Sequence, residues 1–547
     1  MARSRKRRSQ PQVFNQEQRS PTAKPQAPAQ EPAKKRPAAA KQPLADTVAS
    51  LLADRDFWIA ALIFSGVLAG SLWGASCVRI FCFSSVDSFW LIQAGLDVVS
   101  QMRLPGGDYY SFTNYGRPWL LYQWLFEVVV GLIGRAGGLQ ALQAFVEVFS
   151  ALIFTVLGFQ GLIRRGANIW VAGWVTAAAG AAALTFLSLR PHLVSMLMVY
   201  LVQRMVDSHW RQPGWRVLWL GALFVVWANC HLLFSIGLAI VFIYWIASGL
   251  VWLTSRTDAG EPERALNWQR FRLLAVAFVL SVGTSLANPY GWDTITYGLV
   301  TAGQEYWTAH IGEVMAPAFS NPFGALILGY ILVTVVALML ATRRPTLGEG
   351  LVFVGLLATG LTSYKLLPYF VTFSMHGTGL RLQSALAELA GSRIPTRVKV
   401  VSDYLARWAA TPAYAVTVLF LVLAFGLGRP VLLPPWVPVA AADYLESHPL
   451  EGHLFCSAKF GSYLIWRFHG RLPVFIDTRF DMYGPAFSEA YFKANREGVG
   501  WQELFDRYAI RYAVVETSSG MARVLNTQPG WKRLYLDANA VIFGKLD

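Results

Sequence analysis

One stretch of the sequence decides how the chain is organised: residues 84 to 135, SSVDSFWLIQAGLDVVSQMRLPGGDYYSFTNYGRPWLLYQWLFEVVVGLIGR. It lies between two segments that are long and apolar enough to cross a bilayer. Connections longer than roughly a dozen residues are usually functional or disordered. Disordered segments lack the aromatic density that this stretch owes to Trp90, Tyr109, Tyr110, Phe112, Trp119, Tyr122 and Trp124. We therefore predict a folded loop that lies against the membrane surface.

The composition predicts a polytopic membrane protein. Hydrophobic residues make up 54% of the chain and charged residues 14%, and the mean hydropathy is +0.40. Soluble domains are less apolar than this, and long uncharged runs require a bilayer. The formal net charge of +15 lies largely in the first 41 residues and in short loops between apolar runs. This distribution is typical of membrane orientation, so we expect no nucleic-acid partner.

Residues 1–54 are predicted to form a disordered basic cytoplasmic tail. The segment opens with RSRKRR and continues through Pro, Ala, Gln and Lys without periodicity. Because no apolar run begins near Met1, we expect the first span, at about 57–74, to act as an uncleaved anchor. Membrane orientation is the simpler explanation of the basic charge, and binding of anionic lipid or nucleic acid is the alternative.

A transmembrane domain is predicted over residues 55–435, with a large first outer loop at 82–138. Further apolar runs follow that loop, at about 139–162, 169–187, 193–206, 217–228, 232–253, 271–286, 322–341, 351–361, 366–373 and 413–427. Counting residues 119–133 as a span would place many loop arginines outside, so the positive-inside rule favours a flat amphipathic helix there. The result is about eleven spans in a plasma membrane, the inner one in bacteria, with the N-terminus cytoplasmic and the C-terminus extracytoplasmic.

This topology gathers polar residues from the ends of several spans on the outer face. They are Asp87, Asp97, Asp108, Arg190, His192, Asn229, His231, Asn288, Glu305, His310, Glu313 and Lys365. Polar groups at the membrane edge are costly and by default mark a functional site. Taken singly, each has a simpler explanation: a helix-end anchor for Arg190, a core histidine for His231, a turn for Asn288. Their gathering on one face is what favours a shared site.

Several motifs resemble those of the GT-C superfamily of membrane glycosyltransferases. After the first span comes an outward loop with Asp87 before an amphipathic helix, then a turn with Leu104, Pro105, Asp108, Ser111 and Thr113, then Gln123-Trp124-Leu125. The later pieces WANCH (227–231), NPYG (288–291) and GEV (312–314) resemble motifs of less characterised bacterial members. The resemblance covers roughly residues 57–430 in topology, although the motifs occupy only a small part of that length.

The resemblance implies an enzyme that transfers a hexosyl or pentosyl group from a polyprenyl-phosphate sugar donor. An acidic residue in the first outer loop is essential in that superfamily, and Asp87 is the matching position. Ser88 stands where many members carry a second carboxylate nearby, and Gln123 where relatives often have an acid. The metal site is therefore unknown, no cofactor is certain, and a divalent cation stays open. The four cysteines show no CxxC spacing, which leaves only a Cys77–Cys82 disulfide open.

The chemistry of sugar transfer assigns roles to the outer-face residues. A base must remove the proton of the acceptor, which suits Asp87, and a cation must receive the departing phosphate. Arg190, His192, His231 and Lys365 are the available cations or donors, and the planar fork of arginine suits phosphate best. The full set of substrate-binding candidates is Asp108, Arg190, His192, Asn229, His231, Asn288, Glu313, Lys365, Asp477 and Arg479.

Residues 436–547 are predicted to form a soluble α/β domain on the outer face. Strands are expected at 453–457, 473–476, 512–516, 532–536 and 540–544, and helices at 440–446, 460–468, 486–495 and 501–508. Asp477 and Arg479 follow an apolar strand, where ligand-binding residues often lie in α/β sheets. A local ion pair between these two side chains that shapes a turn is the equal alternative.

Two functions follow from the sequence. The first is a glycosyltransferase that acts on an extracytoplasmic glycan, lipid or protein acceptor within the lipid bilayer. The second is a non-catalytic membrane protein, for glycan transport or envelope assembly, on a transferase-like scaffold. Transporters usually show internal repeats, and none is found in the sequence. An inactive relative is favoured by the missing partner carboxylate at Ser88.

Overall fold

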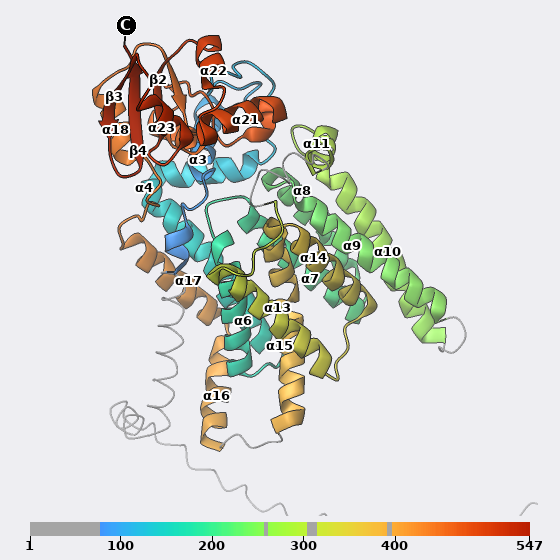
Figure 1. Cartoon of the computed structure of the whole chain (residues 1–547). Coiled ribbons are helices and arrows are strands. Elements are labelled where there is room, and N and C mark those ends of the chain that lie inside the picture. The colour runs from blue at the N-terminus through green and yellow to red at the C-terminus, as the bar shows by residue number, and fades with distance from the viewer. Residues whose placement is uncertain (1–76, 256–260, 303–313, 391–395, 547) are drawn as a thin grey trace, which may run out of the picture. The chain divides into compact units, whose positions relative to one another are not determined.

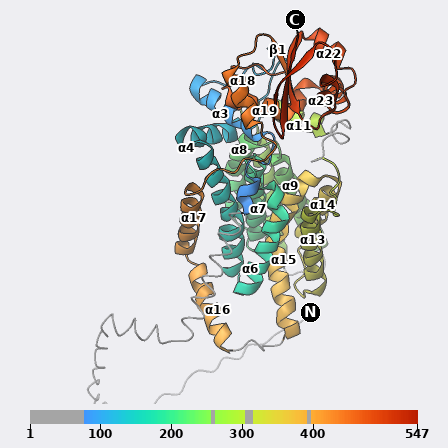
Figure 2. The same ribbon diagram turned by 60° about the vertical axis from the view of Figure 1, so that its left-hand side comes forward.

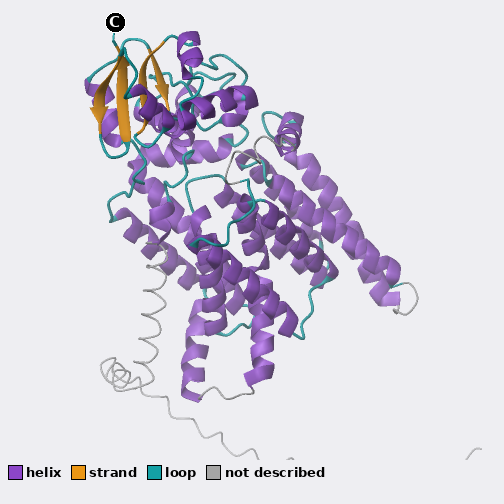
Figure 3. Cartoon of the chain, in the orientation of Figure 1, coloured by secondary structure: helices purple, strands orange, loops and turns teal. Residues whose placement is uncertain are grey.

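A computed structural model of the chain describes residues 77–255, 261–302, 314–390 and 396–546. All of them belong to one compact unit that runs from residue 55 to residue 547. The predicted basic tail and the predicted first span lie outside the described residues. Within the described residues the chain is mainly helical, and its four strands all lie in the C-terminal part (Figure 3).

The predicted apolar runs form helices in the order expected from the sequence. After α3 (Ser88–Gln101) the chain forms α4 (Trp124–Ala151), the π-helix η1 (Leu152–Gln160), α5 (Gly161–Ile163), α6 (Ile169–Ala183), η2 (Leu184–Phe186), α7 (His192–Arg211), η3 (Trp215–Trp219), α8 (Leu220–Cys230), α9 (Phe234–Thr254) and α10 (Glu261–Ser285). It continues through α11 (Trp292–Ala302), α13 (Pro322–Leu340), α14 (Leu347–Thr362), η4 (Tyr364–Leu366), α15 (Leu367–Ala390), α16 (Thr396–Ala409) and α17 (Pro412–Leu427). Most of the long helices run side by side in both views (Figures 1 and 2).

Among the described residues, four helical segments are long and apolar enough to cross a membrane. They are Trp124–Ile163, Ile169–Phe186, Phe234–Thr254 and Pro322–Leu340. The pair Ser402–Ala409 and Pro412–Leu427 passes the same test only as a unit bent by 79°. Other helices of this region are shorter or carry polar ends, such as Leu347–Thr362. The total of about eleven spans therefore stays a prediction.

Helix α4 is broken near the place where the sequence predicted a change from a flat helix to a span. Gly137 and Gly138 have non-helical backbone angles, and Gly138 has a φ of 60°, a region that favours glycine. The part before the break packs on α3 through two glycines. A Cβ atom on Gly95 would lie 1.8 Å from the carbonyl oxygen of Glu127, and one on Gly131 would lie 2.5 Å from the carbonyl carbon of Gly95. This crossing fixes α3, and with it the segment that carries Asp87.

The C-terminal part is an α/β domain, as predicted, and its sheet has four of the five predicted strands. Its elements are α18 (Val439–Ser447), β1 (His453–Cys456), α19 (Ala458–Arg467), α20 (Phe480–Tyr483), α21 (Pro485–Phe492), η5 (Lys493–Glu497), α22 (Trp501–Arg507), β2 (Ile510–Glu516), α23 (Gly520–Leu525), β3 (Trp531–Leu536) and β4 (Ala540–Lys545). The strand order is β1-β2-β4-β3, with β1 parallel to β2 and the other neighbours antiparallel. Buried apolar residues of β2 and β4 form the centre of the core.

The strand predicted at 473–476 is wrong, and its true partner explains why. Val474 makes a single bridge with Ser111 in the first loop instead of joining the sheet. Its amide donates to the carbonyl of Tyr110 at 2.9 Å, and its carbonyl accepts from the amide of Phe112 at 3.2 Å. The apolar pattern indicated a buried extended segment correctly, but the partner comes from a distant part of the chain.

All four cysteines are free, so the disulfide left open between Cys77 and Cys82 is not formed. Cys82 is fully buried in the apolar core. Its backbone carbonyl accepts a hydrogen bond from the amide of Leu189 at 2.8 Å. Cys82 therefore packs beside the segment that leads to Arg190.

Candidate functional site

Asp87 stands immediately before α3, where an aspartate usually caps the helix with its side chain. Here the carboxylate makes no capping hydrogen bond. Oδ2 lies 2.7 Å from Nη2 of Arg190. Oδ1 accepts from the Thr478 hydroxyl at 2.5 Å and from the Trp90 indole at 3.4 Å. The carboxylate is therefore held by the side chains of Arg190, Thr478 and Trp90, and it does not cap the backbone of α3.

Arg190 is placed beside Asp87 by two hydrogen bonds that its neighbour Leu189 makes with residues on either side of Asp87. The amide of Leu189 donates to Cys82, and the carbonyl of Leu189 accepts from the Ser88 hydroxyl at 3.2 Å. Arg190 itself follows η2 and precedes Pro191, which starts α7 with a fixed φ. The side chains of Arg190 and Asp87 keep 25% and 16% of their surface exposed. The ion pair is thus ordered and still open to a ligand from one side.

Three further candidates, His192, His231 and Lys365, lie close to Arg190. The charges of His192, Arg190 and Lys365 all act on the His231 ring. Lys365 lies in η4, in the predicted break between two apolar segments, and Ser363 before it is extended. The break is held against η2 because the Tyr364 and Thr185 hydroxyls are hydrogen-bonded at 2.6 Å. The structure therefore brings together the cationic residues that the sequence predicted.

His231 is hydrogen-bonded through Ser195 to the Trp227 indole. The Trp227 indole can only donate, and it donates to Oγ of Ser195 at 2.7 Å. Oγ of Ser195 in turn lies 2.7 Å from Nδ1 of His231 and has both a proton and a second lone pair for this contact. Ser195 thus occupies Nδ1, so a ligand beside Arg190 would meet the ring at Nε2.

The two candidate asparagines hold helices and loops together. Asn229 accepts from the Trp124 indole at 2.7 Å and donates to the carbonyls of Val225 and Ala287 at 2.8 and 2.9 Å. Asn288 accepts from the amide of Tyr290 at 2.9 Å, as in an Asx turn. The side-chain amides of both residues are thus engaged with protein atoms in this structure.

Of the remaining candidates, His192 is hydrogen-bonded to the backbone, and Glu313 lies outside the described residues. The His192 ring nitrogen Nε2 is hydrogen-bonded to the carbonyl of Phe186, so this nitrogen is the donor. Glu313 lies outside the described residues, and so do Glu305 and His310. The predicted role of Glu313 stays a prediction.

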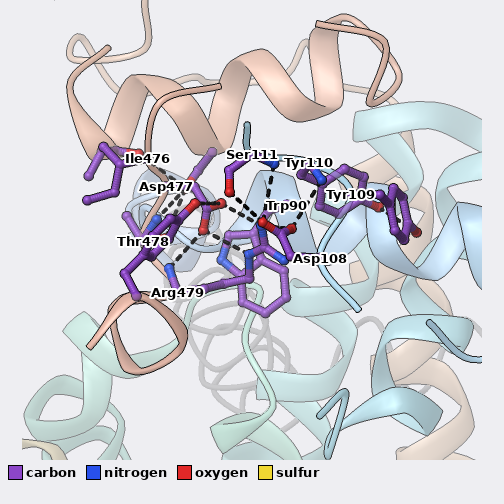
Figure 4. A network of polar contacts seen from close by, with 12 residues as sticks. Trp90, Asp108, Tyr109, Tyr110, Ser111, Ile476, Asp477, Thr478 and Arg479 are labelled. Atoms are coloured by element: carbon purple, nitrogen blue, oxygen red, sulfur yellow. Dashed lines mark hydrogen bonds and ion pairs between the residues drawn. The ribbon is translucent and has the colours of Figure 1, made fainter. Parts of the chain in front are cut away.

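Asp108, Asp477 and Arg479 form one buried network that joins the first loop to the C-terminal domain (Figure 4). Arg479 donates from Nε and Nη2 to the two oxygens of Asp477 at 2.8 and 2.6 Å, and from Nη2 to Asp108 at 2.9 Å. The side chains of both aspartates are fully buried, and that of Arg479 is 3% exposed. The ion pair suggested by the sequence is present, but it also includes a third residue from the first loop.

The surroundings of this network stabilise its charges. Asp477 also accepts from the Tyr483 hydroxyl at 2.9 Å, and Asp108 accepts from the Ser111 hydroxyl. The Arg479 guanidinium lies over the Trp119 ring, 4.3 Å from its centroid. Burial alone would lower the pKa of Arg479, but the two aspartates outweigh it and raise that pKa well above its ordinary value. The Arg479 guanidinium is therefore charged at every physiological pH.

Three consecutive residues of one turn, 477–479, thus contact Asp87 and Asp108 of the first loop directly or through one partner. Arg479 binds both Asp477 and Asp108, while Thr478 donates to Asp87. The preceding segment pairs with residues 110–112, which brings the turn to this place. Sequence reasoning singled out Asp477 and Arg479 and missed Thr478, although it lies between them.

Tyr122, Tyr297 and Asp481 form a second group beside Asp87 that the sequence did not single out. The Tyr297 hydroxyl donates to Asp481, and the rings of Tyr122 and Tyr297 lie 5.4 Å apart. Burial, followed by the charges of Asp481 and Asp87, raises the pKa of Tyr122 well above its ordinary value. The phenol of Tyr122 therefore stays protonated and lies within the electrostatic reach of Asp87.

The side chains around Asp87 do not fit a divalent cation, and a separate cavity lies elsewhere in the described residues. Within the described residues, no three His, Cys, Asp or Glu side chains come together in a way that could hold a metal ion. The donor set around Asp87 is an arginine, a threonine and an indole, which does not fit a divalent cation. A separate cavity of about 260 Å³ lies between the first loop and the C-terminal domain, lined by Asn114, Arg117 and Phe487 among others.

Comparison with known proteins finds likeness at the level of structure. No protein-family model and no curated protein matches the sequence. The chain is similar to the Archaeoglobus fulgidus oligosaccharyltransferase in its apo form, with 12% identity and a TM-score of 0.49, over 82% of this chain and 69% of that one. It is also similar to ArnT from Cupriavidus metallidurans in two states.

The ArnT structure bound to undecaprenyl phosphate matches with 15% identity and a TM-score of 0.48, over 90% of this chain and 98% of that one. The apo structure matches with 14% identity and a TM-score of 0.49, over 89% and 97%. These likenesses concern the overall structure alone. At such identities and TM-scores they assign neither an activity nor a substrate to this chain.

Proposed function

We propose that this protein is a membrane glycosyltransferase that moves a sugar from a polyprenyl-phosphate donor to an extracytoplasmic acceptor. The observation that carries the proposal is the partly exposed ion pair of Asp87 and Arg190, 2.7 Å apart. A carboxylate next to an arginine supplies both groups that the transfer needs, a base and a phosphate-binding cation. The acceptor is a hydroxyl of a glycan, a lipid or a protein.

In the proposed reaction, Asp87 takes the proton of the acceptor hydroxyl while the acceptor oxygen bonds to the anomeric carbon. The bond from that carbon to the phosphate oxygen breaks, and the electron pair leaves with the polyprenyl phosphate. Arg190 lies where the leaving phosphate needs a cation, and its planar fork can bind two phosphate oxygens at once. The proton ends on Asp87, so atoms and charges balance.

In this proposal three further residues help Arg190 to bind the phosphate end of the donor. Lys365, which is exposed on η4, supplies a second charge. His231 presents Nε2 to the donor, because Ser195 occupies Nδ1. His192 acts on the same His231 ring, and its own Nε2 is hydrogen-bonded to the carbonyl of Phe186.

The remaining candidates are proposed to shape the site. Asp108, Asp477 and Arg479 bind one another, and Asn229 and Asn288 bind backbone and indole groups. Each of them fixes a segment that carries or flanks Asp87, Arg190 or the loop between them. In the same proposal the N-terminus is cytoplasmic and the site faces the outside of a bacterial inner membrane.

A non-catalytic envelope protein is the second candidate, and one observation favours it. Asp87 already has protein partners for both of its oxygens, so it can serve as a purely structural ion pair. In that case Asp87→Asn would lower the stability of the protein, and no transfer would be found for the wild type. In the proposed enzyme the wild type transfers sugar.

The test is a transfer assay with the full-length protein in lipid nanodiscs. A panel of radiolabelled polyprenyl-phosphate hexoses and pentoses is incubated with glycan, lipid and peptide acceptors, with and without a chelator. Release of polyprenyl phosphate with labelling of one acceptor supports the enzyme. The chelator arm tests the divalent cation that the sequence left open. Absence of transfer from every donor would favour the non-catalytic protein.

A further inference from the structure

The C-terminal domain touches the proposed base directly through a single hydroxyl group. Thr478 Oγ1 lies 2.5 Å from Asp87 Oδ1, although the two residues are 391 positions apart in the chain. An ionised carboxylate can only accept hydrogen bonds, so the threonine is the donor. Hydrogen bonds to a charged group are shorter and stronger than those between neutral groups. This contact is of the length expected for such a bond.

A second hydroxyl supports the threonine from behind. Ser462, which is fully buried on α19, has its Oγ 2.9 Å from Thr478 Oγ1. The only proton of the Thr478 hydroxyl is directed to Asp87, so Ser462 is the donor in this pair. The amide of Thr478 also donates to Ser462 at 3.4 Å. The result is a directed chain, Ser462 to Thr478 to Asp87, in which every proton points toward the carboxylate.

The neighbours of Thr478 in the chain lock its position. Asp477 and Arg479 on either side are bound in the buried network with Asp108. Buried, paired charges hold their backbone in one geometry, because loss of a partner leaves an uncompensated charge. Thr478 is therefore not a mobile surface side chain that happens to reach Asp87. The turn holds the Thr478 hydroxyl in contact with the carboxylate.

The contact with Thr478 limits rotation of the Asp87 carboxylate. Arg190 holds Oδ2 at 2.7 Å, and the Trp90 indole reaches Oδ1 only at 3.4 Å. The Thr478 hydroxyl binds Oδ1 at 2.5 Å and is the closer of these two contacts to that oxygen, so it contributes most to fixing the plane of the carboxylate. A base works efficiently only when its lone pair is aimed at the proton that it removes.

We propose that Thr478 is a positioning residue for Asp87, so that the C-terminal domain completes the catalytic site. This inference rests on the proposed transferase function. Thr478 acts through Asp87 and does not touch the reacting atoms. Its loss should therefore lower kcat and leave the KM for the donor unchanged, because Arg190 and the other cations remain in place.

The decisive variants are Thr478→Val, which removes the hydroxyl at nearly the same shape, and Thr478→Ser, which keeps it. We expect kcat to fall about 10- to 100-fold in Thr478→Val with the donor KM unchanged. Thr478→Ser should restore most of the loss. Thr113→Val is the matched control, since the Thr113 hydroxyl bonds the carbonyl of Phe475 at 2.6 Å across the same interface and does not touch Asp87.

A second measurement needs no activity. Thermal unfolding of Thr478→Val, Asp87→Ala and the double variant tests the contact itself, because Asp87→Ala removes both carboxylate oxygens and interacting residues give non-additive losses. A double variant that loses less than the sum of the two Tm shifts supports the contact. Additive shifts, or an equal fall of kcat in Thr113→Val and Thr478→Val, would overturn the proposal. A wild type without transfer, combined with non-additive shifts, would instead refute the proposed function and leave a structural contact without a catalytic role.

Discussion

Replacement of Arg479 by methionine tests how strongly the C-terminal domain is attached to the first loop. The substitution keeps an unbranched apolar stem, shortens the side chain and removes its charge. Two fully buried carboxylates, Asp477 and Asp108, then lose a partner that lies 2.6 to 2.9 Å from them. Removing one partner of a buried ion pair costs about 3–5 kcal/mol. That is a large part of the roughly 5–15 kcal/mol by which ordinary domains are stable.

The assay is thermal and urea unfolding of purified protein in nanodiscs, with a matched arginine in the same domain as control. Arg507 forms an exposed pair with Glu503 at 2.6 Å, with side chains 60% and 76% exposed. Such i,i+4 pairs contribute only about 0.3–0.5 kcal/mol. Arg507→Met should therefore be nearly silent, whereas Arg479→Met should unfold early.

A triple variant sharpens this test. Arg479→Met combined with Asp477→Asn and Asp108→Asn removes the uncompensated charges and should recover part of the lost stability. The same loss in Arg479→Met and Arg507→Met would refute the argument that the buried network stabilises the domain contact. A triple variant less stable than Arg479→Met would show that the carboxylates act by another route.

Three further predictions concern the phosphate, alkaline pH and membrane topology. Arg190→Lys should weaken binding of a polyprenyl-phosphate donor about tenfold, because a bidentate fork becomes a point charge; equal affinities in titration would mean that Arg190 only anchors α7. Burial raises the pKa of Tyr463 to about 12. The buried neutral phenol therefore stabilises the fold fully below the unfolded-state pKa of about 10, and this stabilisation is lost as the pH rises from about 10 to 12. Urea midpoints measured between pH 8 and 12 should show this fall and a weaker one in Tyr463→Phe, and identical profiles would contradict it. A reporter fused after Leu162 should be cytoplasmic and one fused after Asp547 extracytoplasmic, and an external reporter after Leu162 would make residues 119–133 a true span.

The sequence predicted those parts of the fold whose causes are local. Apolar periodicity located most of the helices from α6 to α17, and alternation located β1, β2, β3 and β4 to within a few residues. The break before Lys365 was visible because polar residues interrupt two short apolar runs. Such signals depend on neighbours within one element, so a single sequence contains them.

The contacts that build the site are not local, and the sequence could give only their components. Asp87 and Arg190 were both placed on the outer face, but their ion pair depends on how residues 82, 88 and 189 pack together. Thr478 carries no signal of its own, because a lone threonine after an apolar segment is common. Thr478 reaches Asp87 because residues 110–112 pair with Val474. The apolar pattern of residues 473–476 could not distinguish this pairing from a strand of the sheet.

The central claim is that Asp87 is the base of a sugar transfer, and one substitution tests it most directly. Asp87→Asn keeps the size of the side chain and can still accept from Thr478, but it cannot take a proton. General-base catalysis supplies about a hundred- to ten-thousandfold. In the nanodisc transfer assay we predict a loss of that size, with expression and the position of the C-terminal domain unchanged. Activity within severalfold of the wild type would contradict the account and remove Asp87 from the mechanism.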